Sequence, residues 1–262
     1  MAGFAESIRN IWSVQELRER ILYTLGLLII YRFGTFVTLP GVDAGALAQI
    51  NAQQGGGGGL GGLLNMFVGG AFKQAGIFAL GIMPYITASS IIQLMGAVVP
   101  YFQKLQREGE EGRRRITQLT RYGTIGITAL QSIGYAINLL AGATGRAVVI
   151  NSTLFMVTTV IVLTSGTALV MWLGERISED GIGNGISLII MIGIIAFLPQ
   201  ALINEVQLVG DNIFILLLEI GVWVLVTGGV VLVSQGMRRI PVQYAKRVVG
   251  RKAYGGSTQY LP

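Results

Sequence analysis

Long apolar runs separated by short polar segments dominate this chain. Six runs of about 19–26 residues cover residues 21–39, 75–100, 122–142, 150–173, 182–203 and 212–235. At about 1.5 Å per residue, a helix of this length crosses a hydrocarbon core roughly 30 Å thick. Backbone groups find no water there, so each run is expected to be helical. The pattern predicts an all-α integral membrane protein with six transmembrane helices.

Two shorter segments do not fit a spanning helix. Residues 1–20 place apolar and polar positions at helical spacing and predict an amphipathic cytoplasmic helix lying at the membrane interface. Residues 60–74 follow a glycine-rich linker and are too short to span. They predict a re-entrant half-helix, which is tolerated at membrane depth only where protein or water surrounds it.

The composition supports a membrane protein and excludes several kinds of chemistry. Charged residues make up 12% of the chain, against about 25% in soluble domains. The sequence has no Cys and no His, which excludes Ser-His-Asp, Cys-His and H-E-x-x-H catalysis. No Lys lies inside a predicted span and no nucleotide-binding motif occurs. We therefore expect neither an enzyme nor a cofactor site.

The distribution of Lys and Arg predicts the orientation. With the N-terminus in the cytoplasm, 16 of the 19 basic residues fall in cytoplasmic segments. The remaining three are Arg32, Lys73 and Arg146. An excess of positive charge on cytoplasmic loops is the usual signal of membrane orientation. The chain is therefore expected to cross the membrane several times with a cytoplasmic N-terminus.

The predicted helices 75–100 and 182–203 each carry a face of regularly spaced residues. At 100° per residue, the members of each set fall within about 60° of one another. The sets are Ile82, Ile86, Ser89 and Gln93 in the first helix and Ile186, Ile190, Gly193 and Phe197 in the second. Ordinary packing inside a bundle explains such faces. The alternative is a hydrophobic constriction, in which branched side chains close a pore by excluding water.

Two polar segments have more than one interpretation. Residues 175–185 are glycine-rich but lack the G-x-x-x-x-G-K-[ST] pattern of a phosphate loop, which favours a tight turn between helices. Residues 236–262 hold six basic residues, no acidic residue and three tyrosines. They predict a basic cytoplasmic hairpin or loop. Its charge either serves orientation alone or attracts acidic lipid, RNA phosphate or an acidic protein surface.

Several motifs together resemble one family. The segments 65–71, 78–89 with Gln93, 112–123, 181–187 and 238–247 are similar, in order and spacing, to motifs of the SecY family. The resemblance covers essentially the whole chain. SecY proteins are the central subunits of the bacterial protein-conducting channel, with ten spans in two inverted halves. The chain is therefore expected to be an incomplete portion: the first inverted-repeat half of that fold plus span six.

The resemblance implies roles for individual residues. The pore ring would include Ile82, Ile86, Ile186 and Ile190. The plug that seals the outer funnel would include Gly61, Leu64, Asn65, Met66, Phe67, Gly69, Gly70 and Phe72. The lateral gate, through which signal sequences leave for lipid, would include Thr87, Ser89 and Gln93. Contacts with the ribosome and SecA would come from Arg238, Arg239, Lys246, Arg247, Arg251 and Lys252.

The resemblance also implies a function. The channel would translocate unfolded preproteins across the bacterial inner membrane and release apolar segments into it. Its partners would be SecE, SecG, SecA, ribosomal RNA, the signal sequences of preproteins and membrane lipids. The alternative is a secondary transporter with inverted repeats. Such a transporter usually places polar or ionisable groups at mid-membrane, whereas the matched faces here carry isoleucine.

Arg32 and Glu219 lie at equal predicted depth, about 10 Å from the outer end of their spans. An ion pair between them would relieve the cost of each charge. In that case Arg32→Glu should lower the melting temperature of the protein in detergent, and the double variant Arg32→Glu/Glu219→Arg should restore it. If instead the two side chains reach separately toward the interface, the double variant will not recover.

Overall fold

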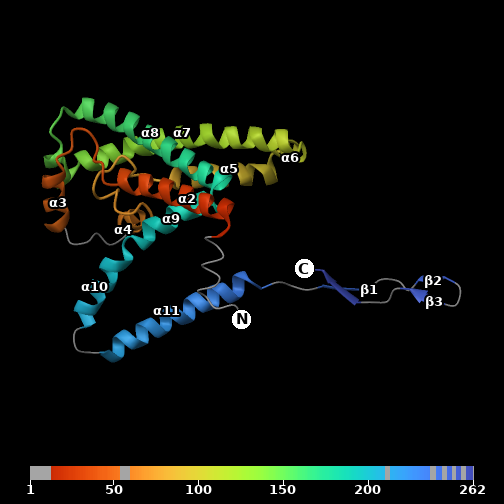
Figure 1. Cartoon of the computed structure of the whole chain (residues 1–262). Helices are drawn as coiled ribbons and strands as arrows, with labels where there is room; N and C mark the ends of the chain where they lie inside the picture. Colours follow the sequence, from red (N-terminus) through yellow and green to blue (C-terminus); the bar gives the residue numbers. More distant parts are fainter. Residues whose placement is uncertain are drawn as a thin grey trace. The chain divides into compact units, whose positions relative to one another are not determined.

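The structure is a computed structural model, and the residues that it describes divide into two units. The described residues are 13–53, 60–209, 213–236, 240–243, 247–249, 252–254 and 258–261. The first unit covers Met1–Pro199 and the second covers Gln200–Pro262. Figure 1 shows a helical bundle in the first unit, and a long helix followed by strands in the second.

Two long helices of the first unit lie side by side (Figure 1). They are α7 (Glu110–Leu140) and α8 (Ser152–Asp180), joined through the 3-10 helix η1 (Gly142–Ala147). Small hydroxyl residues line the buried side of α7, and the hydroxyls of Thr124 and Thr128 each donate to the carbonyl four residues earlier, at 2.7 Å. Small side chains let helices approach closely, and these hydroxyls are satisfied within their own helix.

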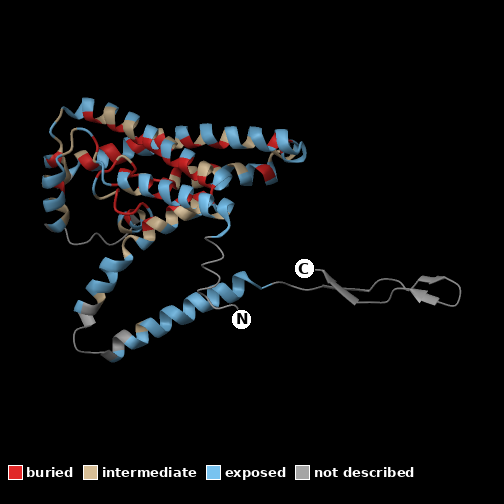
Figure 2. Ribbon diagram, in the orientation of Figure 1, coloured by how far each residue is buried: buried red, intermediate tan, exposed pale blue. Residues whose placement is uncertain are grey.

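Three further helices pack against this pair. They are α2 (Gln15–Gly34), α5 (Met83–Val98) and α9 (Gly185–Ile195). α5 lies along α7, whereas α2 and α9 contact α8 and each other. Figure 2 shows that buried residues lie on the inward sides of these helices and on the irregular chain that precedes α5.

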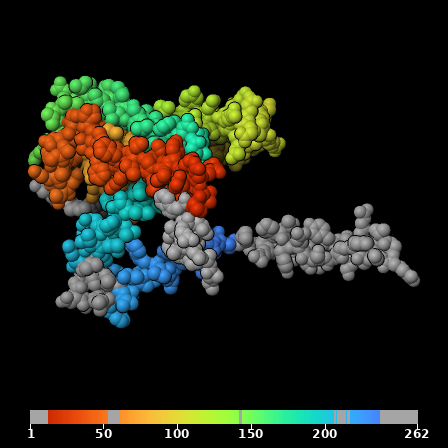
Figure 3. All heavy atoms as spheres, viewed as in Figure 1, coloured from red at the N-terminus to blue at the C-terminus, as the bar shows by residue number. Residues whose placement is uncertain are grey.

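Three short helices complete the first unit. They are α3 (Ala44–Gln53), α4 (Leu60–Phe67) and α6 (Pro100–Arg107). α3 packs beside η1, α4 packs against α9, and α6 packs against α5 and α7. Figure 3 shows the early helices, in red and orange, over much of the visible face of this unit. The yellow-green end of α7 extends beyond them in the same view.

Two apolar clusters form the core of the first unit. The first surrounds Phe155 and Leu163 of α8, together with Leu139 of α7. The second joins α2, α5, α8 and α9, and its buried members are Leu27, Leu28, Tyr31, Phe78, Ile82, Val170, Leu173, Ile177 and Ile189. Lipid tails are as apolar as these side chains, so the clusters stabilise the bundle through close packing.

The second predicted span, 75–100, is not one helix. Residues 68–82 run as successive turns, and α5 begins only at Met83. Pro84 explains the start, because proline lacks a backbone N–H and fits the first turn of a helix better than its interior. The helix ends at Val98, and the chain bends by 97° into α6. The predicted half-helix is likewise shorter than expected, since α4 ends at Phe67.

The fifth predicted span, 182–203, is also interrupted. It consists of α9 and the beginning of α10 (Leu198–Val209), with Ala196 and Phe197 between them. Pro199 stands in the first turn of α10, where its missing N–H costs no helical hydrogen bond. The stretch Gly185–Glu205 is nevertheless apolar enough to span a membrane.

The other predicted spans of the first unit lie on observed helices with shifted ends. The span 21–39 lies largely on α2, which begins earlier and ends at Gly34. The span 122–142 falls mostly inside α7, and the span 150–173 falls mostly inside α8. Both helices continue into charged segments, because a helix need not end where the hydrocarbon ends. Most of the predicted N-terminal helix, residues 1–12, lies outside the described residues.

Among the described residues, the second unit contains most of α10, one long helix and two antiparallel ladders. α11 (Ile213–Ser234) nearly coincides with the predicted span 212–235. β1 (Ile240–Gln243) pairs with β4 (Thr258–Leu261), and β2 (Arg247–Val249) pairs with β3 (Lys252–Tyr254). β2 and β3 lie between β1 and β4 in the sequence. The inner pair is therefore nested within the outer pair, as in one long hairpin.

By length and hydropathy, fewer helical stretches qualify as membrane spans than the six that the sequence pattern predicts. Within the described residues, three helical stretches qualify, and a fourth does if α5 and α6 form one bent span. The three lie in α8, in α9 with α10, and in α11. Polar side chains such as Arg32 in α2 and Gln131 in α7 lower the hydropathy of these two helices. The count of six therefore stays a prediction.

A methyl group at Gly166 of α8 would collide with the carbonyl oxygen of Ile77. We expect Gly166→Ala to lower the free energy of unfolding by about 1–3 kcal/mol, as overpacking does. Gly126→Ala on α7 is the matched control, because open space surrounds its Cβ position. It should be neutral or stabilising by up to about 1 kcal/mol. Thermal unfolding of the complete protein in detergent measures both, and equal melting temperatures would contradict this close approach.

Candidate functional site

The helices α5 and α9, together with Ile82 at the N-cap of α5, bring four isoleucines into one apolar cluster. Ile82 has only 4% of its surface exposed, while Ile86, Ile186 and Ile190 are half-buried and pack against the same buried residues. We call these four side chains the isoleucine cluster. Helical spacing placed each pair on a face of its own helix, and the structure adds that the two pairs belong to one cluster. Their role in a pore ring stays a prediction.

Two stacked aromatic rings belong to the same core. Tyr31 of α2 and Phe78 have ring centroids 5.7 Å apart and planes that differ by 9°. Both are almost fully buried and belong to the cluster that contains Ile82. Packed aromatic pairs stabilise their surroundings beyond the area that they bury. The isoleucine cluster is therefore supported by a well-packed neighbourhood.

The start of α9 is fixed by side-chain hydrogen bonds. The Asn184 side chain accepts from the backbone N–H groups of Ile186 at 3.0 Å and Ser187 at 3.3 Å. The Ser178 hydroxyl of α8 accepts from the Gly185 N–H at 2.9 Å. Asparagine is a favoured helix N-cap because it satisfies N–H groups that have no partner in the first turn. The glycine-rich segment before α9 is thus a short turn that sets where α9 begins.

The half-helix α4 is only loosely covered. Leu63, Met66 and Phe67 expose 60%, 43% and 39% of their surfaces. Of the predicted plug residues in this helix, Gly61 is also exposed, Leu64 is half-buried and Asn65 is buried. The other predicted plug residues, Gly69, Gly70 and Phe72, follow the helix, and the two glycines are buried. The exposed helix therefore leads into a buried connection.

Asparagine side chains hold this connection, which we call the base segment, residues 68–76. The Asn51 amide of α3 donates to the Lys73 carbonyl at 2.8 Å. The Lys73 N–H donates to Oδ1 of Asn65 at 2.9 Å. A non-helical backbone among apolar helices needs such partners for its polar groups.

A tyrosine of α7 holds the base segment from another direction. The Tyr135 hydroxyl donates to the Phe72 carbonyl at 2.7 Å, and the two rings meet edge to face with centroids 5.0 Å apart. Tyr135 has only 5% of its surface exposed. Sequence pattern does not indicate this contact, because 63 positions separate the two residues.

α9 touches the base segment and the end of α4 with the face that also carries Ile186 and Ile190. A methyl group at Gly193 would lie 2.6 Å from the Phe67 carbonyl oxygen. A methyl group at Gly70 would lie 3.3 Å from Cζ of Phe197. The predicted face of α9 therefore runs from the isoleucine cluster to the base segment.

The chain that enters α5 touches the base segment as well. A methyl group at Gly81 would lie 3.1 Å from Cγ2 of Val68. Gly81 has a φ of +52° and directly precedes Ile82. The two segments that carry the isoleucine cluster therefore each meet the base segment at a glycine, Gly81 before α5 and Gly193 in α9. Backbones can approach closely at glycines.

Arg32 of α2 contacts the base segment. Its Nη1 donates to the Gly69 carbonyl at 2.6 Å, and its guanidinium carbon lies 4.8 Å from the centroid of the Phe36 ring. The sequence alone had suggested Glu219 as its partner. Glu219 belongs to the second unit, so that hypothesis is not tested and stays a prediction.

The three predicted gate residues follow one another along α5. Thr87 and Gln93 are exposed and Ser89 is half-buried. The Gln93 amide donates to the Ser89 hydroxyl at 3.2 Å, and the Thr87 hydroxyl donates to the Met83 carbonyl at 3.1 Å. These polar groups are satisfied within their own helix, which leaves their exposed side available to another chain or to lipid.

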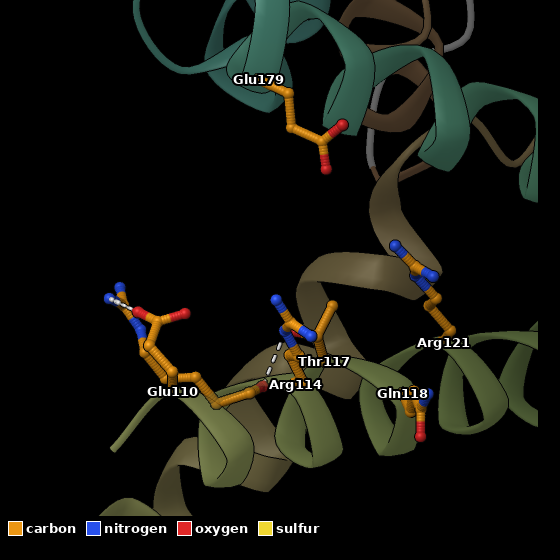
Figure 4. A pocket seen from close by; sticks show the side chains of 7 residues that line it. Glu110, Arg114, Thr117, Gln118, Arg121 and Glu179 are labelled. Atoms are coloured by element: carbon orange, nitrogen blue, oxygen red, sulfur yellow. Dashed lines mark hydrogen bonds and ion pairs between the residues drawn. The ribbon is translucent and has the colours of Figure 1, made fainter.

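An open pocket of about 330 Å³ lies between the ends of α7 and α8 (Figure 4). Sequence reasoning did not identify it. Its lining residues are Glu110, Arg113, Arg114, Thr117, Gln118, Arg121 and Glu179. Arginines and glutamates share the pocket, and it has no buried wall. Within the described residues, no three side chains of the metal-ligating kind gather in one place.

An ion pair joins α7 and α8 beside this pocket. Arg121 donates from Nε and Nη2 to the two oxygens of Glu175, at 3.0 and 2.8 Å. The hydrogen bond to Glu175 raises the pKa of Arg121 above its ordinary value. Arg121 is 44% exposed, so solvent screens the pair and its contribution to stability is modest. The two-point geometry still fixes how these helix ends meet.

Two of the six predicted contact residues of the basic loop lie on described strands. Arg247 stands opposite Tyr254, and Lys252 stands opposite Val249, in the register of β2 and β3. The other four, Arg238, Arg239, Lys246 and Arg251, lie outside the described residues.

Comparison with known proteins identifies the family. The SecY family model matches residues 76–262, well over half of the chain. The chain belongs to the SecY family. Protein translocase subunit SecY of Escherichia coli K12 is 48% identical over 251 residues, which cover 94% of this chain and 56% of the relative. Protein translocase subunit SecY of Streptomyces scabiei is 44% identical over 271 residues, covering 100% of this chain and 61% of the relative.

The chain thus spans a little over half the length of these SecY relatives. A solved structure described as "The structure of a protein conducting channel" matches with a TM-score of 0.49 and 19% identity. The match covers 92% of this chain and 52% of that chain.

Proposed function

We propose that this chain supplies the first half and the sixth span of a protein-conducting channel. The complete channel passes unfolded preproteins across the bacterial inner membrane and releases apolar segments into the bilayer. The observation that carries the proposal is the isoleucine cluster beside the base segment, in a chain of the SecY family. Relatives with 44–48% identity bear the name protein translocase subunit, which supports the same function.

An apolar collar suits a channel for polypeptides. The cargo varies in every side chain, so a charged filter would bind some cargo too tightly and repel the rest. Branched apolar side chains adapt to any chain, and they block ions by excluding water when no cargo is present. Ile82, Ile86, Ile186 and Ile190 would form the part of this collar that the present chain contributes. The remaining wall would come from the second half of the channel.

The half-helix α4 is proposed as the plug that seals the outer side of the collar. Its exposed side chains and its contact with α9 at Gly193 support this role. The face of α5 around Thr87, Ser89 and Gln93 is proposed as one wall of the lateral gate, since two of these polar residues are exposed. Signal sequences would pass along it into lipid.

The cytoplasmic side is proposed to bind the machinery that drives translocation. No nucleotide-binding motif occurs in the chain, so the energy comes from a partner. The basic loop, residues 236–262, would contact ribosomal RNA and SecA. SecE and SecG would be the membrane partners, and the N-terminus would lie in the cytoplasm. The excess of Lys and Arg in the predicted cytoplasmic segments supports this orientation.

Polar substitution in the isoleucine cluster should open the channel to ions. In the complete channel, Ile86→Ser or Ile190→Ser is expected to raise the resting ion conductance severalfold, because a polar side chain wets the constriction. The same variants should export preproteins with defective signal sequences more readily. Conductance in planar bilayers and export in cells measure the two effects.

The matched control is Ile161→Ser, since Ile161 lies on α8 with 60% of its surface exposed. It should leave the resting conductance unchanged. Wild-type conductance in both cluster variants would count against the pore assignment.

Charge reversal in the basic loop should weaken binding of cytoplasmic partners. Arg247→Glu or Arg251→Glu is expected to lower the affinity for ribosomes and for SecA severalfold at low salt, with a smaller difference at high salt because ions screen exposed charges. Co-sedimentation measures the affinity. Arg146→Glu is the control, because Arg146 lies on the predicted outer side. Unchanged binding of both partners at both salt concentrations would remove this role from the loop.

A further inference from the structure

Two glycines of the base segment, Gly69 and Gly70, follow the half-helix α4. Gly69 has a φ of +67° and Gly70 a φ of +97°. Residues with side chains rarely adopt these values. We call this pair the glycine joint. Because a joint of glycines can change its backbone angles at little cost, it is the natural place for α4 to move relative to the rest of the bundle.

The two sides of the glycine joint are held unequally. Before it, α4 exposes Leu63, Met66 and Phe67. After it, Phe72 and Lys73 are tied to α7 and α3 through the contacts with Tyr135 and Asn51. Residues 71–76 are therefore tied to two other helices, whereas the side-chain hydrogen bond of α4 itself runs from Asn65 to Lys73, across the joint.

Gly69 lies between a cation and a second backbone. A methyl group at Gly69 would lie 2.7 Å from Nη1 of Arg32 and 3.3 Å from Cα of Gly193. Arg32 approaches from α2 and Gly193 from α9. The joint is thus enclosed by two different helices, and Arg32 is the only one of the two with a side chain that can release it.

The bond from Arg32 is of a strong kind. A charged donor at 2.6 Å from a carbonyl oxygen makes a charge-assisted hydrogen bond, which is stronger than a neutral one. Phe36 and the Thr35 hydroxyl also contact the guanidinium, which limits its orientations. No carboxylate pairs with Arg32 among the described residues of the first unit. The Gly69 carbonyl is therefore its principal polar partner there.

We propose that Arg32 is a positioning residue that latches the plug. Its guanidinium holds the Gly69 carbonyl, and with it α4, in the resting position, and breaking this bond is a step in opening. The proposal rests on the proposed function of α4 as a plug. It adds a specific residue outside the plug that sets how often the plug leaves its place.

The surroundings make the latch sensitive to water. In a dry site the bond is worth most, because no water competes for the guanidinium or for the carbonyl. When water enters the channel, it can replace both halves of the bond, and the net cost of release falls. Wetting of the constriction and release of the plug would therefore promote one another.

The test uses the complete channel, reconstituted in lipid vesicles and planar bilayers. Arg32→Gln removes the charge and should raise the resting ion conductance per channel by about tenfold or more, the range expected for loss of one charge-assisted hydrogen bond. Arg32→Lys keeps a charged donor, so its resting conductance should lie between that of Arg32→Gln and that of the wild type. Arg146→Gln, an exposed arginine on the same predicted side, should leave the conductance unchanged.

A second readout follows the plug itself. Residues 1–262 contain no cysteine, and Met66 on α4 is 43% exposed. Met66→Cys in a cysteine-free channel reports displacement through its rate of reaction with a membrane-impermeant maleimide. Arg32→Gln should raise this rate while the melting temperature and the amount of assembled channel stay near wild type.

The outcomes separate the latch from the proposed function. If Arg32→Gln changes neither conductance nor labelling while Ile86→Ser and deletion of residues 60–67 both increase conductance, the latch is overturned and the channel stands. If none of these variants increases conductance, the proposed function itself fails. Loss of assembled channel in both Arg32 variants would make the residue structural and overturn the latch. Full recovery of the melting temperature in Arg32→Glu/Glu219→Arg would assign Arg32 to an ion pair with Glu219. That result would also overturn the latch.

Discussion

The need to satisfy backbone hydrogen bonds is the constraint on which this bundle depends. Residues 68–82 are not helical, yet they pass among apolar helices where an unpaired N–H or carbonyl group finds little water. Backbone partners supply part of the answer, since Leu39 donates to Ala75 and Ile77 donates to Val37, each at 2.8 Å. Side chains of α2, α3, α4 and α7 supply further partners for Gly69, Phe72 and Lys73. Polar residues inside this bundle therefore serve the backbone, and they determine where α4 and α5 can lie.

One helix carries two parts of the proposed mechanism. α9 bears Ile186 and Ile190 of the isoleucine cluster and, less than one turn beyond Ile190, the glycine that contacts the end of α4. A helix of 11 residues is stiff over such a distance. Any shift of α9 that widens the cluster also changes the space available to the glycine joint. Gly193 would thus connect the proposed collar to the proposed plug, without a separate signalling element.

The sequence predicted the features that depend on local pattern. Apolar runs indicated membrane helices, and helical spacing placed Ile186, Ile190 and Gly193 on one face. Family motifs indicated SecY, and the family comparison confirmed it. The breaks before α5 and within 182–203 were missed, although Pro84 and Pro199 mark them. The contacts of Arg32 and Tyr135 with backbone carbonyls were beyond prediction, because a carbonyl leaves no trace in the sequence and its donor lies 37 or 63 positions away.

The helices α7 and α8 combine one interhelical ion pair with a long stretch of packed side chains. In the described part of the chain, the side-chain hydrogen bonds that connect the two helices are those between Arg121 and Glu175. Elsewhere the hydroxyls of α7 bond to their own helix, as Thr124 and Thr128 do. The two helices are therefore tied to each other near both ends, by this ion pair at one and by η1 at the other, and close packing holds the stretch between. The shape of the packed side chains, rather than hydrogen bonding between the helices, therefore sets the angle at which α7 and α8 cross.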